Sequence, residues 1–281
     1  MTTDIGAQFR ALHKPGEPFI LANAWDAGSA KMLAALGAQA IGTSSAAHAF
    51  TLGRPDGGLV ARDEALAHAA DLAAATPLPV SGDFENGFGD APDVVAETVR
   101  LSADAGLAGI SIEDTEFPSG QSYGFEAAVE RITAAVEAAK AVPGDFVLLA
   151  RADGVMLGNY DTDEAIRRIQ AYEQAGADAV YVPLPPDMSE LARVCQSVSI
   201  PVNALAAGPF TEVPYTAFAE AGVARISLGS ALARLTHRVI HDAATAMFER
   251  GDFSPLGNGI GGGTIDRLLT HEASGGQSES S

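Results

Sequence analysis

The feature that most constrains the fold is a series of eight short apolar runs separated by stretches with helical spacing. Four junctions look alike, because each joins the end of a helical stretch, through a glycine, to an apolar run; they begin at Leu36, Ala105, Ala175 and Ala221. The eight runs span residues 19–23, 38–43, 78–83, 108–113, 146–151, 179–183, 200–205 and 224–229. Clear helical stretches span residues 61–75, 93–106, 125–142 and 161–176.

Apolar runs that alternate with crossover helices indicate a parallel sheet covered on both faces. Eight such units favour a closed (β/α)8 TIM barrel. The alternative is an open, doubly wound sheet. Against it, no GxGxxG turn follows the first run, since "NAWDAGSA" has the wrong spacing.

The chain continues past the eighth run into a long amphipathic stretch, residues 230–253, and a glycine-rich segment. We therefore predict a barrel domain with its long helix over 1–250, an additional C-terminal helical extension over 251–270 and a disordered tail over 271–281. The long helix either caps its own barrel or packs on a neighbouring subunit, and the sequence does not distinguish these.

Composition excludes several classes of function. Of 281 residues, 36 are acidic and 17 are Lys or Arg, so the net charge of −19 repels nucleic acid and anionic membrane surfaces. No stretch is apolar enough for a membrane span or a signal peptide, and the one cysteine, Cys195, excludes an internal disulfide. We expect a cytoplasmic protein in which an anionic small substrate needs a metal ion or a placed arginine.

Polar residues end nearly every apolar run. Because active sites of (β/α)8 barrels lie at the carboxyl ends of the strands, these residues predict a charged pocket. In chain order the residues at or next to the run ends are Asn23, Ser44, Asp83, Glu113, Arg151, Pro183, Asn203 and Ser227, and all but Pro183 are polar.

Three acids, Asp83, Glu85 and Glu113, follow the third and fourth runs without a His or Cys pair nearby. Oxygen-only ligands suit Mg²⁺ or Mn²⁺, and Mg²⁺ keeps several waters. We expect Asp83 to bind the metal directly and the two glutamates to hold its waters. The alternative is that these acids cap helices or pair with arginines; the strand end at Arg151 favours a site.

Three motifs in order, "GDFENGFGD", "SIEDTEF" and "LLARADG", make the chain resemble the isocitrate lyase/phosphoenolpyruvate mutase superfamily from about residue 8 to about residue 250. The resemblance implies a (β/α)8 barrel and a homo-oligomer, a dimer or a tetramer joined through the C-terminal helix. It also implies Mg²⁺, a small 2-oxo carboxylate substrate and a C–C or P–C bond broken through an enolate.

By position, the resemblance assigns roles to single residues. It implies metal binding by the acids, substrate contact by polar residues of the first, second, fifth and seventh runs, and catalytic roles for Arg151, Ser44 and Glu113. The implied metal residues are Asp83, Glu85, Glu113 and Asp56, and the implied substrate-binding residues are Trp25, Ser44, Ser45, Arg151 and Asn203.

The loop after the fourth run departs from the family's best-known members. It lacks the Lys-Cys-Gly-His run of isocitrate and methylisocitrate lyases, and Cys195 lies elsewhere, where we expect a packed residue. It offers Ser119 and Gln121 where phosphoenolpyruvate mutases bring a lysine and an asparagine, and Pro183 replaces their histidine.

The sequence therefore predicts a Mg²⁺-dependent lyase that cleaves or decarboxylates a small 2-oxo or 2-hydroxy carboxylate, like oxaloacetate or methylisocitrate. The alternatives are P–C bond chemistry and an inactive carboxylate-binding barrel. Residues 116–125 would form a lid, in which Tyr123 and Gln121 either contact substrate or face solvent. His48 would either move protons near the site or serve the structure.

Overall fold

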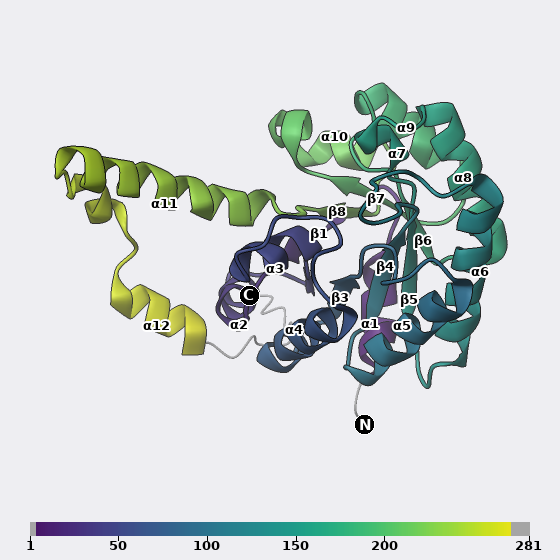
Figure 1. The fold of residues 1–281 in the computed structure, drawn as a ribbon, viewed down its shortest axis with the longest axis horizontal. Helices are drawn as coiled ribbons and strands as arrows, with labels where there is room; N and C mark the ends of the chain where they lie inside the picture. Colours follow the sequence, from purple (N-terminus) through teal and green to yellow (C-terminus); the bar gives the residue numbers. More distant parts are fainter. Residues whose placement is uncertain (1–3, 271–281) are drawn as a thin grey trace, which may run out of the picture.

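The computed structural model describes residues 4–270, and its centre is a closed barrel of eight parallel strands (Figure 1). Each strand pairs with the next along the chain, and β8 pairs with β1. The barrel prediction is confirmed. The strands are β1 Phe19–Asn23, β2 Ala40–Gly42, β3 Val80–Asp83, β4 Gly109–Glu113, β5 Val147–Arg151, β6 Ala179–Tyr181, β7 Val202–Leu205 and β8 Arg225–Ser227.

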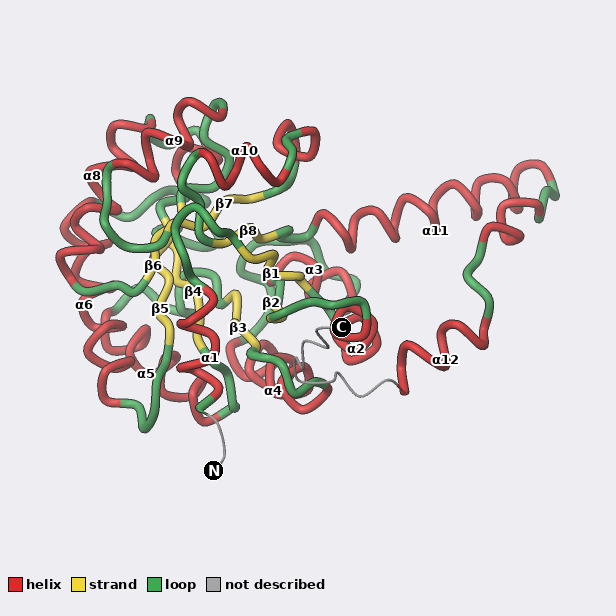
Figure 2. Tube along the Cα trace, turned by 180° about the vertical axis from the view of Figure 1, so that it is seen from behind, coloured by secondary structure: helices red, strands yellow, loops and turns green. Residues whose placement is uncertain are grey.

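Helices surround this barrel (Figure 2). The four helices expected from spacing are present as α4, α5, α6 and α8, with ends within two residues of those predicted. The α-helices are α1 Ile5–Leu12, α2 Ala27–Ala35, α3 Ser45–Thr51, α4 Arg62–Ala75, α5 Pro92–Asp104, α6 Phe125–Ala141, α7 Gly154–Leu157, α8 Thr162–Ala175, α9 Met188–Gln196, α10 Tyr215–Glu220, α11 Ala231–Arg250 and α12 Gly262–Thr270, and two 3₁₀ turns span Gly208–Glu212 and Ser254–Asn258.

The strands are buried on both faces. Their outward side chains pack against the surrounding helices, and their inward side chains lie in the closed interior of the barrel. In β4, Ile110 and Ile112 belong to the main core between strands and helices, together with Leu148 of β5. Ser111 and Glu113 alternate with them along the strand and, by the period of two, point into the barrel. The same alternation places Arg151 inside.

Helix α1, which the sequence did not indicate, covers the amino-terminal end of the barrel. Its Phe9 is fully buried in a cluster with Phe19 and Val147 from the ends of the strands. At Gly6 the helix touches the backbone so closely that an added Cβ would lie 1.6 Å from the carbonyl oxygen of Asp145. Arg10 adds an ion pair to Asp145, so α1 is attached to this end by both apolar and charged contacts.

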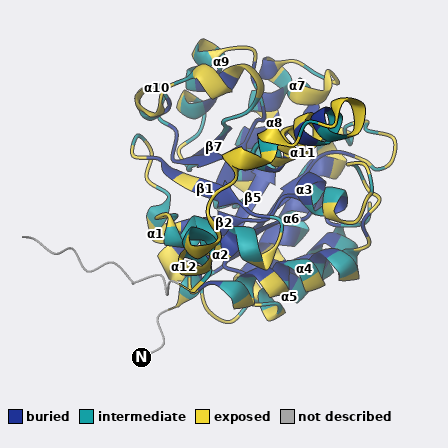
Figure 3. Ribbon diagram, turned by 90° about the vertical axis from the view of Figure 1, so that its left-hand side faces the viewer, coloured by how far each residue is buried: buried dark blue, intermediate teal, exposed yellow. Residues whose placement is uncertain are grey.

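The long helix α11 projects away from the barrel, and the chain returns through α12 to lie beside α2 (Figure 1). Much of α11 is exposed (Figure 3), and its exposed apolar residues are Leu235, Val239, Ile240 and Phe248, of which Phe248 is 86% exposed. The helix therefore does not cap its own barrel. The predicted disordered tail, 271–281, lies outside the described residues. Among residues 4–270, no helix combines the length and apolar composition needed to cross a membrane.

Two residues predicted at strand ends, Pro183 and Asn203, do not end their strands. The sixth strand stops at Tyr181 rather than Pro183, because the chain turns away before the proline, which has no N–H for a sheet. The seventh strand ends at Leu205, as its run predicts, so Asn203 lies within the strand, two residues before its end.

Candidate active site

A polar cavity of about 170 Å³ opens at the carboxyl ends of the strands. It extends from Asp56 in a loop and Ser45 at the start of α3 down to side chains in the barrel interior. The polar residues that line it are Asn23, Thr43, Ser44, Ser45, Asp56, Ser81, Asp83, Ser111, Arg151, Tyr181, Arg225, Ser227 and Ser230. The structure thus brings together most of the residues predicted from the strand ends.

Arg151, at the end of β5, is the centre of the charged network. Its guanidinium forms ion pairs with Asp83 at 2.8 Å, Glu113 at 2.9 Å and Asp153 at 3.0 Å, and lies over the ring of Tyr181. Burial alone would lower the pKa of Arg151, but the three carboxylates outweigh burial and raise it. The arginine therefore stays charged, and its charge is shared among three acids.

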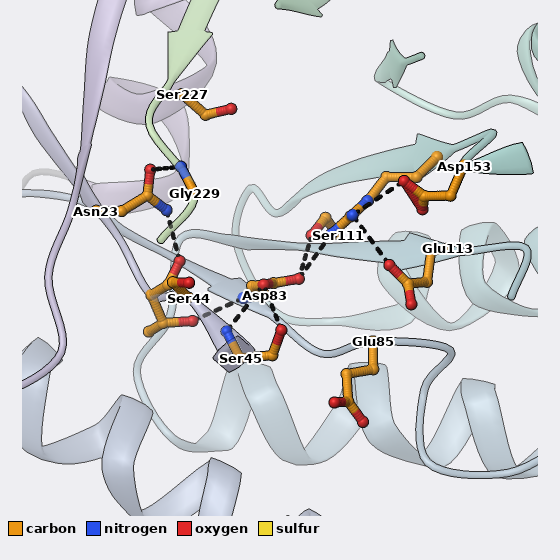
Figure 4. A network of polar contacts seen from close by, with 12 residues as sticks. Asn23, Ser44, Ser45, Asp83, Glu85, Ser111, Glu113, Asp153, Ser227 and Gly229 are labelled. Atoms are coloured by element: carbon orange, nitrogen blue, oxygen red, sulfur yellow. Dashed lines mark hydrogen bonds and ion pairs between the residues drawn. The ribbon is translucent and has the colours of Figure 1, made fainter. Parts of the chain in front are cut away.

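Asp83 connects β3 to the loop after β2 (Figure 4). Its Oδ2 accepts hydrogen bonds from the backbone N–H and the hydroxyl of Ser45, at 2.9 and 2.8 Å. Its own backbone N–H donates to Thr43 Oγ1. A carboxylate held by several donors keeps one orientation, which is what a metal ligand or a catalytic acid requires.

Negative charges are crowded beside this network. Glu85 is only 5% exposed and lies apart from the hydrogen-bonded group in Figure 4. Burial raises its pKa to about 7, the N–H of Gly58 partly opposes this, and Asp83 and Asp56 raise it further. Burial and then Asp83 also raise the pKa of Asp56. The pKa of Glu113 is raised by burial despite Arg151.

The backbone at Glu85 is unusual, since its φ of 47° lies in the left-handed region that a side chain rarely adopts. Strained residues persist where the surrounding structure requires them, often at functional sites. The left-handed backbone of Glu85 and its raised pKa both indicate that the conformation of the β3–α5 loop lowers the stability of the protein.

A divalent cation fits this donor set. Asp83, Glu85, Glu113 and Asp56 supply only oxygen, and a cation would relieve the repulsion that raises their pKa values. Within residues 4–270, however, no group of three His, Cys, Asp or Glu side chains converges as a ready-made metal cage. The arrangement therefore suits a cation that keeps much of its water, as Mg²⁺ does.

A second buried hydrogen-bond network is centred on Asp114 and was missed by sequence reasoning. It holds the backbone of Asp153, which belongs to the Arg151 network. Asp114 accepts hydrogen bonds from Arg168 at 2.8 Å, from Tyr160 at 2.7 Å and from the backbone N–H of Asp153 at 2.8 Å. It thereby fixes the segment that presents Asp153 to Arg151. The only sequence signal for Asp114 was its position directly after Glu113. Asp114 does not line the cavity.

Two predicted substrate contacts lie elsewhere. Asn203 does not line the cavity, because its amide is used by Ser227 and Arg225. Trp25 lines a neighbouring open depression with His48 and His68 rather than the cavity of Arg151. Ser44 does line the cavity, and its hydroxyl also caps α3.

The loop between β4 and α6 leans on the loop that carries Asp56. An added Cβ at Gly58 would lie 2.7 Å from the Phe117 side chain, so glycine permits this close approach. Tyr123 uses its hydroxyl on Asp90 and Asn86 and does not line the cavity. Gln121 and Ser119 are exposed.

His48 stacks on His68, with ring centroids 3.8 Å apart, behind the loop of Ser44. Burial, and then His68, lower the pKa of His48 to about 4, so the ring is neutral near pH 7. Cys195, as expected, is packed on α9, and burial raises its pKa to about 12. The thiol is therefore unreactive.

Sequence reasoning also missed four residues of the site, which either lie within their strands or stand close to a residue that was predicted. These are Ser111, Asp153, Tyr181 and Arg225, of which all but Asp153 line the cavity directly. The signal was present in the period of two, since inward residues lie two apart along each strand.

Comparison with known proteins agrees with this architecture. The family model described as phosphoenolpyruvate phosphomutase matches residues 9–248. A crystal structure from Burkholderia cenocepacia, described as a candidate lyase or mutase, superposes with a TM-score of 0.91 at 44% identity and covers 96% of this chain and 97% of its own. A phosphonopyruvate hydrolase in complex with oxalate and Mg²⁺ has a TM-score of 0.82 at 23% identity, over 95% of each chain, and shows the fold alone.

Curated relatives cover most of the chain. An uncharacterized Mycobacterium tuberculosis protein is 40% identical over 79% of this chain and 81% of its own. The 2,3-dimethylmalate lyase of Eubacterium barkeri is 34% identical over 68% of each. An oxaloacetate decarboxylase of Pseudomonas entomophila is 32% identical over 71% of this chain and 69% of its own. The chain therefore belongs to the phosphoenolpyruvate mutase/isocitrate lyase superfamily.

Proposed function

We propose that this protein is a Mg²⁺-dependent carbon–carbon lyase that cleaves or decarboxylates a small 2-oxo or 2-hydroxy carboxylate through an enolate. The observation that carries the proposal is the buried network in which Arg151 pairs with Asp83, Glu113 and Asp153, with Arg151 and Asp83 on the cavity wall. The curated relatives named as a 2,3-dimethylmalate lyase and an oxaloacetate decarboxylase act on substrates of this class.

Asp83, Glu85, Glu113 and Asp56 would hold Mg²⁺, directly or through water, and Mn²⁺ has the same preference for oxygen. When bound, the ion would stabilise negative charge on the 2-oxo group of the substrate. Arg151 would orient the same end of the substrate and add fixed positive potential where charge develops. Ser44 and Ser45 line the wall beside it and would bind the substrate carboxylate.

The loop after β4 supports C–C rather than P–C chemistry. Between Glu116 and Gly124 the loop contains no Lys, Arg or His, so it offers no cation to a phosphonate. Its contact with Gly58 places it beside the acids, where closure would exclude water from an enolate. Cleavage of isocitrate itself is disfavoured because the loop has no cysteine to act as an acid.

Helix α11 supports a homo-oligomer, a dimer or a tetramer. Its exposed apolar residues form a surface that a soluble monomer would rarely present to water. We propose that another copy of the chain covers this helix. The free thiol and the absence of a long apolar segment suit a reducing cytoplasm.

Calorimetry with oxalate and Mg²⁺, followed by a pyruvate-release assay on a panel of 2-oxo diacids, tests the proposal. We expect oxalate to bind only with the divalent ion, and at least one diacid to be cleaved. The Asp83→Ala variant should lose metal-dependent binding, whereas Asp104→Ala, at an exposed position on α5, should not. Tight oxalate binding without any turnover would instead support a carboxylate-binding barrel that has lost catalysis.

A further inference from the structure

Arg225 is a charged residue of the cavity that has no role in the proposed reaction. Arg225 is the first residue of β8 and lies opposite Asn203 of β7 in the sheet register. The residue is 4% exposed, yet its side chain lines the cavity. Ser227, two residues further along the strand, faces the cavity nearer the opening, so Arg225 belongs to the floor.

The guanidinium of Arg225 is oriented but not neutralised. Its Nε donates to Asn203 Oδ1 at 2.9 Å, and the Asn203 amide in turn donates to Ser227 Oγ at 2.9 Å. Its Nη1 is buried without a hydrogen-bond partner, and within residues 4–270 no carboxylate forms an ion pair with it. Arg151, in the same cavity, has three.

The groups around Arg225 do not compensate for its charge. Burial lowers its pKa to about 10, Tyr181 opposes this, Arg151 lowers it further and Asp83 raises it, so Arg225 remains a cation at neutral pH. On the other side, burial and the charge of Arg225 lower the pKa of His13 to about 3, which leaves the imidazole neutral. A buried guanidinium without a counter-ion costs several kcal/mol of stability, roughly, unless a ligand supplies the anion.

The topology separates Arg225 from the acids. In the closed ring of eight strands, β8 lies four strands away from β4, which carries Glu113, and three away from β3, which carries Asp83. An anion at Arg225 therefore lies across the barrel from the predicted metal residues. A ligand that binds the metal residues at one end would need a second negative group at its other end to pair with Arg225.

We propose that Arg225 binds a second carboxylate of the substrate, so that the protein selects short 2-oxo dicarboxylates over 2-oxo monocarboxylates. The inference rests on the proposed function for the end of the ligand that the metal chelates. It adds a binding site for the carboxylate at the opposite end. Asn203 then acts as a positioning residue, which aims the guanidinium into the cavity and explains why both ends of its amide are occupied by protein.

The test compares two ligands on parent protein and Arg225→Met by calorimetry with Mg²⁺. Oxalate occupies only the chelated end, whereas 3,3-difluorooxaloacetate adds a distant carboxylate. We expect Arg225→Met to weaken binding of the difluoro diacid about 10- to 100-fold, the effect of losing a charged hydrogen bond, and oxalate binding by less than about threefold. Arg100→Met, at an exposed position on α5, is the matched control.

The outcomes separate this inference from the proposed function. If the parent protein does not bind oxalate with Mg²⁺, the proposed function fails and the inference fails with it. If the parent binds oxalate but Arg225→Met loses both ligands equally, or neither, the second-carboxylate site is wrong while the lyase proposal stands. Selective loss of the diacid supports the site.

A stability measurement keeps the test informative. Removing an unpaired buried charge should leave the free Arg225→Met protein as stable as the parent or more stable, while the rise in melting temperature caused by the diacid is lost. If Arg225→Met does not fold, Arg225→Gln, which keeps a donor for Asn203 without the charge, carries the same comparison. Diacid binding by that variant at parental affinity would overturn the inference.

Discussion

Arg151 and Asp83 meet at 2.8 Å across the cavity, from strands that are two apart in the barrel. Asp83 is held at the same time by the N–H and the hydroxyl of Ser45. One ion pair thus connects the loop after β2, the end of β3 and the end of β5. A ligand that displaces Asp83 from Arg151 would change the orientation of three segments of the site.

Replacing Arg151 by lysine should weaken Mg²⁺-dependent oxalate binding at least about tenfold, because an ammonium cannot serve several planar contacts at once. Calorimetry measures the effect, and turnover should fall by a larger factor if the arginine contacts the enolate oxygen. Arg100→Lys is the control. Oxalate affinity equal to that of the parent would remove Arg151 from the substrate site.

The stability of the metal-free protein should fall as the pH rises from about 5 to 8. The pKa of Glu85 is about 7 in the folded protein and near its ordinary value of 4.5 when unfolded, so the folded state binds more protons in this range. The linked loss is up to about 3 kcal/mol. Urea unfolding in a chelating buffer, on the parent and on Glu85→Gln, measures it.

Glu85→Gln should lose much of this pH dependence and be more stable than the parent at pH 8, yet bind oxalate and Mg²⁺ more weakly. Added Mg²⁺ should stabilise the parent at pH 8 more than at pH 5, where protons compete with the metal for Glu85. Identical pH profiles for the two proteins would show that Glu85 is not the titrating group.

The exposed apolar side of α11 should determine the oligomeric state. Serine at Leu235, Ile240 and Phe248, which are 60%, 64% and 86% exposed, removes apolar surface without touching the barrel core. Light scattering after gel filtration should report an oligomer for the parent and a smaller species for the triple variant. A parent that is already monomeric at micromolar concentration would contradict the proposal.

Asp114→Ala should destabilise the protein by about 2 to 4 kcal/mol, because it removes one of the two carboxylates that pair with the buried Arg168, leaving Glu164, and removes the acceptor of the Asp153 N–H and the Tyr160 hydroxyl. Chemical unfolding at pH 7 measures this. Asp163→Ala, which breaks an exposed pair with Arg193, should cost less than about 1 kcal/mol. Equal effects of the two variants would mean that the Asp114 network has no special weight.

The barrel could be predicted because each apolar run is long enough to act as a strand and is joined to the next by a helix. The acids were found because they follow those runs directly, as Asp83 and Glu113 do. Arg225 was not found, because a position at the start of a strand looks like core from the sequence. Its place two residues before Ser227 was the one signal, and the structure shows that its side chain lines the cavity.

Other differences arise from packing that the local sequence does not encode. Helix α1 could not be recognised from the sequence as the helix that covers the amino-terminal end of the barrel. Its eight residues, including Gly6 and Phe9, resemble any short amphipathic segment. No local pattern in the sequence indicates that α11 projects away from the barrel. Trp25 was placed by position in a motif, and the chain after β1 turns it toward His68 instead.

Helix α1 has a consequence for ligand exchange. Phe9 and Gly6 of α1 pack against the amino-terminal end of the barrel, and among residues 4–270 these contacts close that end of the interior. If the protein cleaves its substrate as proposed, both fragments would leave through the opening where the substrate entered, the outer one first. Release would be ordered, and the fragment that remains at the floor would compete with fresh substrate.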